Sequence, residues 1–262
     1  MGVVNVTPDS FSDGGLWLDP IAAVAHAREM AAEGADILDV GGESTRPGAE
    51  PVPAAEERRR VVPVIAGIAG EVAGARISID TSKVEVAEAA VAAGATCVND
   101  ITAFRGDPSM AAFVADRGVD CCLMHMLGEP RTMQDDPRYD DVVDDVRAFL
   151  EERLAFAVRA GVTEERIMLD PGIGFGKTLE HNLELLRRLD EIAAIGPPVV
   201  VGASRKSFLG RITGRETAAD RVAGTVAANL IAFQRGARVF RVHDVAPTRD
   251  ALAVAAATLG AR

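Results

Sequence analysis

The stretch IMLDPGIGFGKT, from Ile167 to Thr178, joins a short apolar segment to a glycine-rich turn that precedes a helical pattern. A glycine-rich turn between a strand and a helix suggests a phosphate-binding loop. A P-loop, however, needs four residues between its first glycine and the Gly-Lys-Thr end, and this stretch has three. Its third glycine also comes one residue too early for a dinucleotide-binding turn. We therefore expect Lys177 and Thr178 only to begin the next helix.

This strand-to-helix unit recurs along the whole chain. Apolar runs predict eight strands, at residues 1–6, 36–40, 76–80, 96–100, 120–125, 167–170, 198–202 and 239–243. Helical patterns follow them at residues 19–34, 54–73, 84–93, 108–117, 140–160, 179–194, 218–234 and 246–259. Continuous apolar strands of this length are typical of parallel strands that are buried on both faces.

The alternation within 262 residues leaves two α/β architectures, a doubly wound sheet or a (β/α)8 TIM barrel. Eight even units favour the barrel, as does the absence of a dinucleotide fingerprint after the first strand. No linker, low-complexity segment or charge block divides the sequence. We expect a single domain that spans residues 1–262.

The composition argues against several classes of partner. A net charge of −11 and a pI near 4.9 oppose binding to nucleic acid or to an anionic membrane. No apolar run approaches the length of about 18 residues that spans a bilayer, and no secretory signal is recognised at the N-terminus. Cys97, Cys121 and Cys122 lack metal-ligand spacing, so buried free thiols are expected. These features predict a soluble cytoplasmic protein.

Polar residues stand at the ends of the predicted strands, where a barrel of this type carries its active site. Any one of them could instead be a helix cap or a turn former. Asp100 could simply start a turn, and His125 could be a buried core histidine. Taken together, the strands deliver polar groups at the same end, which predicts a binding site built from Asn5, Glu43, Ser44, Thr45, Arg46, Asp80, Asn99, Asp100, His125, Asp170, Ser204, Arg205, Lys206, Arg241 and His243.

The residue types at these positions indicate the chemistry of a ligand. Asp80, Asn99 and Asp170 suit a flat heterocycle whose edge offers several N–H donors. Asn5 and Asp13 supply hard oxygen ligands suited to Mg²⁺ with a phosphate partner. A local group of cations in a chain of net charge −11 indicates a specific anion such as phosphate or pyrophosphate, held by Arg46, Lys206, Arg241 and His243.

At this point the sequence resembles a known family. Residues 5–13 (NVTPDSFSD) and 42–48 (GESTRPG) resemble the two signature segments of the dihydropteroate synthases, which are pterin-binding TIM barrels. Further similar segments follow in the same order, at residues 79–81, 98–100, 169–176, 202–208 and 241–244. The resemblance covers essentially the whole chain, although Met1 stands where the family usually has several more residues before its first strand.

The resemblance implies condensation of 6-hydroxymethyl-7,8-dihydropterin pyrophosphate with p-aminobenzoate, giving 7,8-dihydropteroate and pyrophosphate on the way to folate. The arylamine would attack a pterin methylene cation after pyrophosphate has left. Mg²⁺ is the implied cofactor, and the implied assembly is a homodimer through the late helices. The apolar face of residues 218–234 is compatible with that dimer, but also with packing on the barrel.

The resemblance also implies a role for each site residue. The pterin would contact Asp80, Asn99, Ile101, Met124, Asp170, Gly202 and Lys206. The pyrophosphate would contact Asn5, Arg241 and His243, with the metal on Asn5. The p-aminobenzoate pocket would be formed by Thr45, Arg46, Pro47, Phe175 and Ser207, with Asp13 reaching in from the first loop. The catalytic residues would be Asp80, Asp170, Lys206, Arg241 and His243.

Two alternatives stay open beside this interpretation. One is a pterin-binding methyltransferase barrel, which would use the same carboxylates to transfer a methyl group to a corrinoid. Such a protein would not need the Thr45-Arg46-Pro47 loop or residues 204–208, and both are present. The other is a pterin-binding paralogue that has lost catalysis. An assay for pyrophosphate release that requires both substrates would separate all three.

Overall fold

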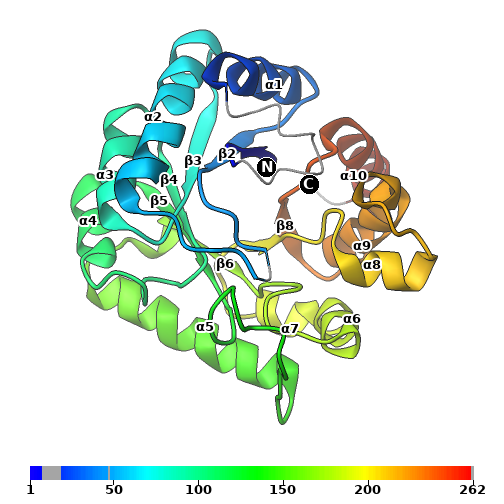
Figure 1. The fold of residues 1–262 in the computed structure, drawn as a ribbon. Helices are drawn as coiled ribbons and strands as arrows, with labels where there is room; N and C mark the ends of the chain where they lie inside the picture. Colours follow the sequence, from blue (N-terminus) through cyan, green and yellow to red (C-terminus); the bar gives the residue numbers. More distant parts are fainter. Residues whose placement is uncertain (8–18, 47, 261–262) are drawn as a thin grey trace.

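The computed structural model describes residues 1–7, 19–46 and 48–260. Within them, eight parallel strands form one sheet in the order of the sequence. Helices surround the strands on the outside (Figure 1). The strands are β1 (Gly2–Asn5), β2 (Ile37–Gly41), β3 (Arg76–Asp80), β4 (Cys97–Asp100), β5 (Asp120–Met124), β6 (Ile167–Asp170), β7 (Val199–Val201) and β8 (Ala237–Phe240). The expected (β/α)8 barrel is confirmed.

The barrel closes between its first and last strands. Gly2 and Val242 form a parallel bridge, and the main-chain N–H of Val3 donates to the carbonyl of Val242 at 3.0 Å. The strand predicted at residues 239–243 is therefore displaced, because β8 itself ends at Phe240. Arg241 and His243 flank the closing residue Val242 in the segment after β8.

The described residues form ten α-helices rather than the eight predicted. The helix expected at 179–194 is divided at Arg188, whose φ of −110° and ψ of 27° are not helical. A further helix, α8, begins at Ser207 and was not predicted. The helices are α1 (Pro20–Ala32), α2 (Ala54–Glu71), α3 (Val84–Ala92), α4 (Met110–Arg117), α5 (Val142–Arg159), α6 (Leu179–Arg187), α7 (Leu189–Ala193), α8 (Ser207–Thr213), α9 (Val222–Gln234) and α10 (Val245–Leu259).

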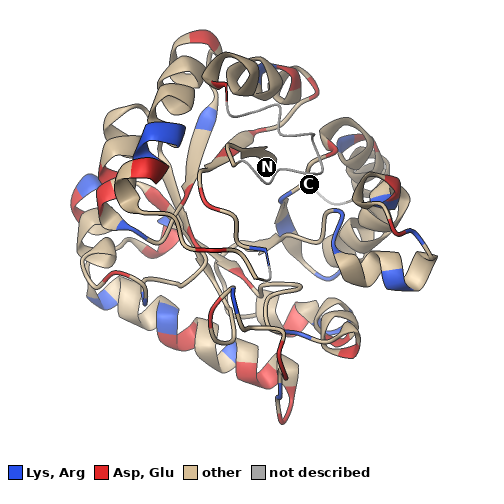
Figure 2. Cartoon of the chain, in the orientation of Figure 1, with Lys and Arg blue, Asp and Glu red and all other residues tan. Residues whose placement is uncertain are grey.

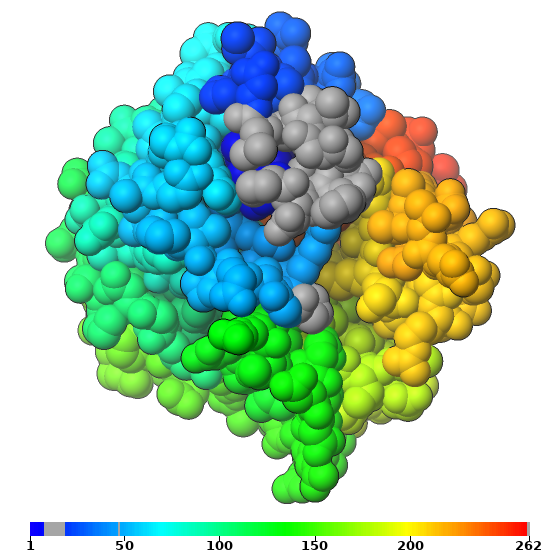
Figure 3. Space-filling model, in the orientation of Figure 1, coloured from blue at the N-terminus to red at the C-terminus, as the bar shows by residue number. Residues whose placement is uncertain are grey.

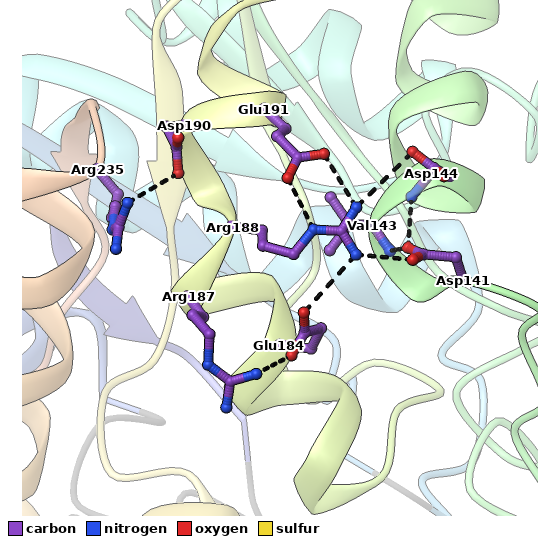
Figure 4. A network of polar contacts seen from close by, with 9 residues as sticks. All are labelled: Asp141, Val143, Asp144, Glu184, Arg187, Arg188, Asp190, Glu191 and Arg235. Carbon is purple, nitrogen blue, oxygen red and sulfur yellow. Dashed lines mark hydrogen bonds and ion pairs between the residues drawn. The ribbon is translucent and has the colours of Figure 1, made fainter.

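Ion pairs at the division between α6 and α7 fasten both helices to α5. The Arg188 guanidinium lies 2.7 Å from Glu191, 2.7 Å from Asp141 and 3.7 Å from Glu184 (Figure 4). Asp141 also caps α5, since its carboxylate accepts from the main-chain N–H of Val143 at 2.8 Å. The network lies among the outer helices, so its role is to hold helices together rather than to bind substrate.

The core has two parts, one between the strands and the helices and one inside the barrel. Leu38, Ile79 and Leu123 are fully buried in the outer part. Inside the barrel, Cys97 and Cys122 pack with Met168 and Val200. Burial raises the pKa of the Cys97 thiol to about 12. All three cysteines are buried and free, as expected.

Charged residues of both signs are spread over the outer helices (Figure 2). In the described part of the chain, no helix is both long enough and apolar enough to cross a membrane.

Candidate active site

The ends of the strands open into a cavity of about 780 Å³. The segments after β2, β5 and β7 meet around it on one face of the molecule (Figure 3). The cavity is lined by thirteen of the residues predicted from the sequence, namely Asn5, Glu43, Ser44, Thr45, Arg46, Asp80, Phe175, Ser204, Arg205, Lys206, Ser207, Arg241 and His243. Asp13 and Pro47 lie outside the described residues.

Five further predicted residues, Asn99, Ile101, Met124, Asp170 and Gly202, are not among those that line the cavity. Ile101 and Met124 instead form an apolar cluster with Phe175, Met126 and Met133, two of which, Phe175 and Met133, line the cavity. A Cβ added at Gly202 would lie 3.9 Å from Nζ of Lys206 and 4.0 Å from Oδ2 of Asp170. These residues thus adjoin those that line the cavity.

Arg241 is the centre of a hydrogen-bonded group that joins the segment after β8 to β2, β3 and β4. Its Nε donates to Oδ2 of Asp39 at 2.6 Å, and its NH2 group donates to Oδ2 of Asp80 at 2.8 Å. Asp39 also accepts from the side-chain amide of Asn99 at 3.1 Å. We define these four residues as the arginine cluster.

Asp39 was not predicted as a site residue. It lies inside β2 rather than at its end, between Leu38 and Val40, and it is completely buried. The available signal was a carboxylate in an otherwise apolar strand, because a buried charge needs a partner. The sequence does not say that the partner is Arg241, which is 202 residues away.

Burial governs the electrostatics of the arginine cluster. It raises the pKa of the Asp80 carboxyl to about 7, while attraction to the Arg241 guanidinium works in the opposite direction. Burial alone would lower the pKa of Arg241, but the charges of Asp39 and Asp80 outweigh burial and raise it. Arg241 is therefore a permanent cation at the edge of the cavity.

Lys206, in the segment between β7 and α8, and Asp170, at the end of β6, form a second charged group beside the cavity. Nζ of Lys206 donates to the carbonyl of Ile173 and lies 4.6 Å from the centre of the Phe175 ring. Oδ1 of Asp170 accepts from the main-chain N–H of Gly172 at 2.7 Å. We define Asp170, residues 172–176 and Lys206 as the lysine cluster.

Burial shifts the pKa values of both charged groups of the lysine cluster. It lowers the pKa of Lys206 to about 8, although the charge of Asp170 works against this shift. It raises the pKa of Asp170, and Lys206 and the Gly172 N–H work against that shift. The two residues thus support each other's charged forms.

The glycines of residues 172–176 are required because the main chain there approaches neighbouring atoms too closely for a Cβ. Gly172 and Gly174 have positive φ values of 67° and 84°. A Cβ at Gly172 would collide with the main-chain carbonyl of His125, and one at Gly174 would lie only 3.0 Å from Cδ of Lys206. The glycine-rich turn therefore brings main chain against Lys206 rather than forming a phosphate loop.

Lys177 is buried, and the prediction that it only begins the next helix was wrong. Thr178 caps α6, so Lys177 precedes the helix and turns inward. Its Nζ lies 2.9 Å from Nδ1 of His125 and donates to the carbonyl of Phe175 at 2.9 Å. His125 is the buried, hydrogen-bonded histidine considered from the sequence, and burial lowers its pKa to about 2.

Asp100 keeps the turn-forming role considered for it. It is buried at the end of β4, and its carboxylate accepts from the main-chain N–H groups of Thr102 at 2.7 Å and Phe104 at 2.9 Å. It thereby shapes the turn that carries Ile101.

His243 and Arg46 also line the cavity. Burial, together with the positive charges of Arg205, Arg241 and Arg46, lowers the pKa of His243 to about 3, against the attraction of Asp244. His243 is therefore neutral at physiological pH. It offers hydrogen bonds rather than charge.

The described residues of the site offer few oxygen ligands to a metal ion. Among the described residues, no group of three or more His, Cys, Asp or Glu side chains could hold a metal ion. Asn5, at the end of β1, lines the cavity together with Arg241 and His243. One amide oxygen beside an anion site fits Mg²⁺ that is bound mainly by phosphate and water.

Comparison with known proteins identifies close relatives. The model of a protein family described as "Pterin binding enzyme" matches residues 1–243. Dihydropteroate synthase of Neisseria meningitidis serogroup B is 50% identical over 261 residues, which cover 97% of this chain and 90% of that protein.

Two solved structures of Xanthomonas albilineans dihydropteroate synthase are also similar. One contains 4-aminobenzoic acid, is 52% identical and has a TM-score of 0.93, covering 100% of this chain and 93% of that chain. The other contains 7,8-dihydropteroate, is 48% identical and has a TM-score of 0.88. It covers 100% of this chain and 94% of that chain.

Proposed function

The chain belongs to the pterin-binding enzyme family, and we propose that it acts as a dihydropteroate synthase in folate biosynthesis. It condenses 6-hydroxymethyl-7,8-dihydropterin pyrophosphate with p-aminobenzoate to give 7,8-dihydropteroate and pyrophosphate. The observation that carries this function is one cavity bounded by both the arginine cluster and the lysine cluster. The relatives of known structure bind 4-aminobenzoic acid and 7,8-dihydropteroate, which are a substrate and the product of this reaction.

The pterin binds above the buried carboxylates. Asp170 and Asp80 accept hydrogen bonds from the N–H groups of its edge, together with the amide of Asn99. The apolar cluster of Met124 and Ile101 packs against the ring. Lys206 donates to a ring acceptor, and Gly202 leaves room beside it.

The pyrophosphate binds at Arg241 and His243. Arg241 has a permanent charge, and His243 is neutral and offers an N–H donor. Asn5 would hold Mg²⁺ together with pyrophosphate oxygens and water, and the ion when bound would neutralise charge on the leaving group. Replacement of Asn5 by alanine should raise the Mg²⁺ concentration needed for half-maximal pyrophosphate binding, measured by calorimetry. Unchanged Mg²⁺ dependence would exclude Asn5 as the ligand.

The p-aminobenzoate binds where Phe175 meets residues after β2 and β7. Thr45, Arg46 and Ser207 line this part of the cavity. Ser207 is the first residue of α8, so main-chain N–H groups at the start of that helix are available to the carboxylate. Pro47 and Asp13 complete the pocket in the proposed arrangement.

The reaction breaks the C–O bond between the pterin methylene and pyrophosphate, and the electron pair leaves with the pyrophosphate. Carboxylates at Asp80 and Asp170 stabilise the positive charge that is left on the pterin. The neutral arylamine nitrogen then forms the new C–N bond and loses one proton. Because an arylamine is uncharged at physiological pH, the site needs no strong general base.

The chain forms a homodimer through its last two helices in this proposal. The helices α9 and α10 pack on each other and leave apolar side chains exposed on their outer faces. Ile231 is 47% exposed, Val254 is 68% exposed and Leu259 is 53% exposed. Exposed apolar groups gathered on neighbouring helices favour an interface. Sedimentation at micromolar concentration tests this, and a monomer would exclude the dimer.

Release of pyrophosphate in the presence of both substrates is the test of the function. We expect rapid release with both substrates and much slower release when p-aminobenzoate is omitted, because a pterin cation that meets no arylamine can recombine with the pyrophosphate beside it. Pterin binding without release would indicate the inactive paralogue. Transfer of a methyl group to a corrinoid would indicate the methyltransferase.

A further inference from the structure

Ser204 and His243 are joined by two hydrogen bonds across the cavity wall. Ser204 lies between β7 and α8, and His243 follows β8. Oγ of Ser204 is 3.0 Å from Nδ1 of His243. The main-chain N–H of His243 donates to the same Oγ at 3.1 Å. One hydroxyl therefore contacts both the main chain and the ring of the histidine.

The hydroxyl can satisfy both contacts in only one favourable way. A serine hydroxyl carries one proton to donate and can accept two hydrogen bonds. The His243 main-chain N–H occupies one acceptor position. Ser204 is only 6% exposed, and within the described part of the chain its hydroxyl has no other acceptor than Nδ1 of His243. Because a buried hydroxyl proton without an acceptor is costly, the proton is donated to Nδ1.

This assignment fixes the other ring nitrogen. Burial and the charges of Arg205, Arg241 and Arg46 keep the imidazole of His243 neutral. A neutral imidazole has one proton, and Nδ1 must be the unprotonated acceptor, so the proton is on Nε2. Because Nδ1 faces Ser204 and His243 lines the cavity, Nε2 is the nitrogen available to a ligand.

We propose that Ser204 is a positioning residue that holds His243 in its Nε2–H form and thereby presents a donor to the leaving pyrophosphate. The inference rests on the proposed function for the identity of the anion. The opposite form would direct the lone pair of Nε2 at a phosphate oxygen, which is repulsive. Ser204 does not touch the anion in this arrangement and acts only through the histidine.

The segment of Ser204 is held firmly enough to set this geometry. Arg205 follows it with a positive φ of 58°, which a residue with a side chain rarely adopts. Its guanidinium binds both carboxylate oxygens of Asp244, at 3.0 and 2.7 Å. Its main-chain N–H donates to Oγ1 of Thr225 at 3.0 Å, and its carbonyl accepts from Arg221 at 2.9 Å. The Arg205–Asp244 pair thus fastens the two segments beside the Ser204–His243 pair.

The direct test is ¹⁵N NMR of the histidine ring nitrogens in the full chain. We expect His243 of the unmodified protein to be in the Nε2–H form. In Ser204→Ala it should shift to a mixture of the two neutral forms, and Ser204→Thr, which keeps a hydroxyl, should restore the Nε2–H signal. An Nδ1–H form in the unmodified protein, or an unchanged signal in Ser204→Ala, would overturn the proposal. The first of these outcomes does not depend on whether a variant folds.

Binding of inorganic pyrophosphate provides a second readout. Ser204→Ala should weaken it by about 2-fold to 5-fold, because only the fraction of His243 that keeps the Nε2–H form offers the donor. In a His243→Gln background, where the amide supplies an N–H group without tautomers, Ser204→Ala should have no further effect. An equal loss in both backgrounds would overturn a role through His243. Ser109→Ala is the control for loss of a serine hydroxyl, because Ser109 is exposed before α4 and does not line the cavity. It should leave pyrophosphate binding unchanged.

These two readouts separate the inference from the proposed function. The NMR signal and pyrophosphate binding are measured without p-aminobenzoate and without turnover. Failure of the condensation assay with the expected tautomer result would refute the function and keep the inference. Normal turnover together with an Nδ1–H form of His243 would keep the function and refute the inference.

Discussion

The arginine cluster and the lysine cluster face the same cavity but are held in different ways. Arg241 is bonded to two carboxylates, Asp39 and Asp80, and is charged at every accessible pH. Lys206 is bonded to a main-chain carbonyl, and burial lowers its pKa to about 8. The arginine cluster is thus a fixed electrostatic structure, whereas the lysine cluster depends on main-chain geometry and remains titratable.

The largest expected effect is on stability and falls on the arginine cluster. Asp39→Ala removes one of the two carboxylates bonded to Arg241, and with it the acceptor of the Arg241 Nε–H and of the Asn99 amide. We expect the free energy of unfolding to fall by about 3 kcal/mol or more, measured by urea denaturation. The matched control is Asp120→Ala, which breaks exposed pairs with Arg76 and Arg166 and should cost less than about 1 kcal/mol. Equal losses would contradict the distinction.

The next effect is on turnover and falls on the lysine cluster. Lys206→Ala and Asp170→Asn should each lower kcat by at least about 100-fold, since each removes a charge that is fixed beside the reacting pterin. Asp170→Asn should change the free energy of unfolding little, because burial already disfavours the charged carboxylate. Near-normal turnover in either variant would remove that residue from the pterin site.

The pH dependence of kcat/KM should show a limb from each cluster. Below about pH 7 Asp80 becomes protonated and loses its negative charge, so kcat/KM should fall toward acid. Above about pH 8 Lys206 loses its proton and its positive charge, so kcat/KM should fall toward base. Asp80→Asn should remove the acid limb and keep the basic one. Loss of both limbs in that variant would show that they report one coupled group.

The smallest effect is expected at Lys177, the second buried lysine. It donates to the carbonyl of Phe175 and lies outside the two clusters. Lys177→Met should raise the KM for p-aminobenzoate by about 5-fold through Phe175 and lower kcat by less than about 5-fold, corresponding to one neutral hydrogen bond. A 100-fold loss of kcat would instead place Lys177 beside Lys206 in the chemistry.

The barrel and the position of the site could be predicted from the sequence because both follow from local patterns. Parallel strands buried on both faces are continuous apolar runs, and the residues that end them must meet at one end of the barrel. This is how Asp80, Asp170 and Arg241 were found. The roles of individual residues came from the family resemblance, and they stay predictions until the variants above are measured.

What the sequence missed depends on contacts between distant segments. Asp39 becomes interpretable only when barrel closure brings Arg241 to it across 202 residues. Lys177 follows Gly176, whose φ of 62° turns the chain so that the lysine faces inward. The helix α8 has seven residues, fewer than two full turns of helical periodicity, so its pattern was too short to recognise.

The division of the cavity between the two clusters is tested most directly by calorimetric titration of Asp170→Asn with two separate ligands, the dihydropterin and inorganic pyrophosphate. We expect affinity for the dihydropterin to fall by about 100-fold, because the lysine cluster holds the pterin edge. Affinity for pyrophosphate, which the arginine cluster and His243 hold, should change by less than about 2-fold. Retained dihydropterin binding with lost pyrophosphate binding would contradict the division of the cavity between the two clusters.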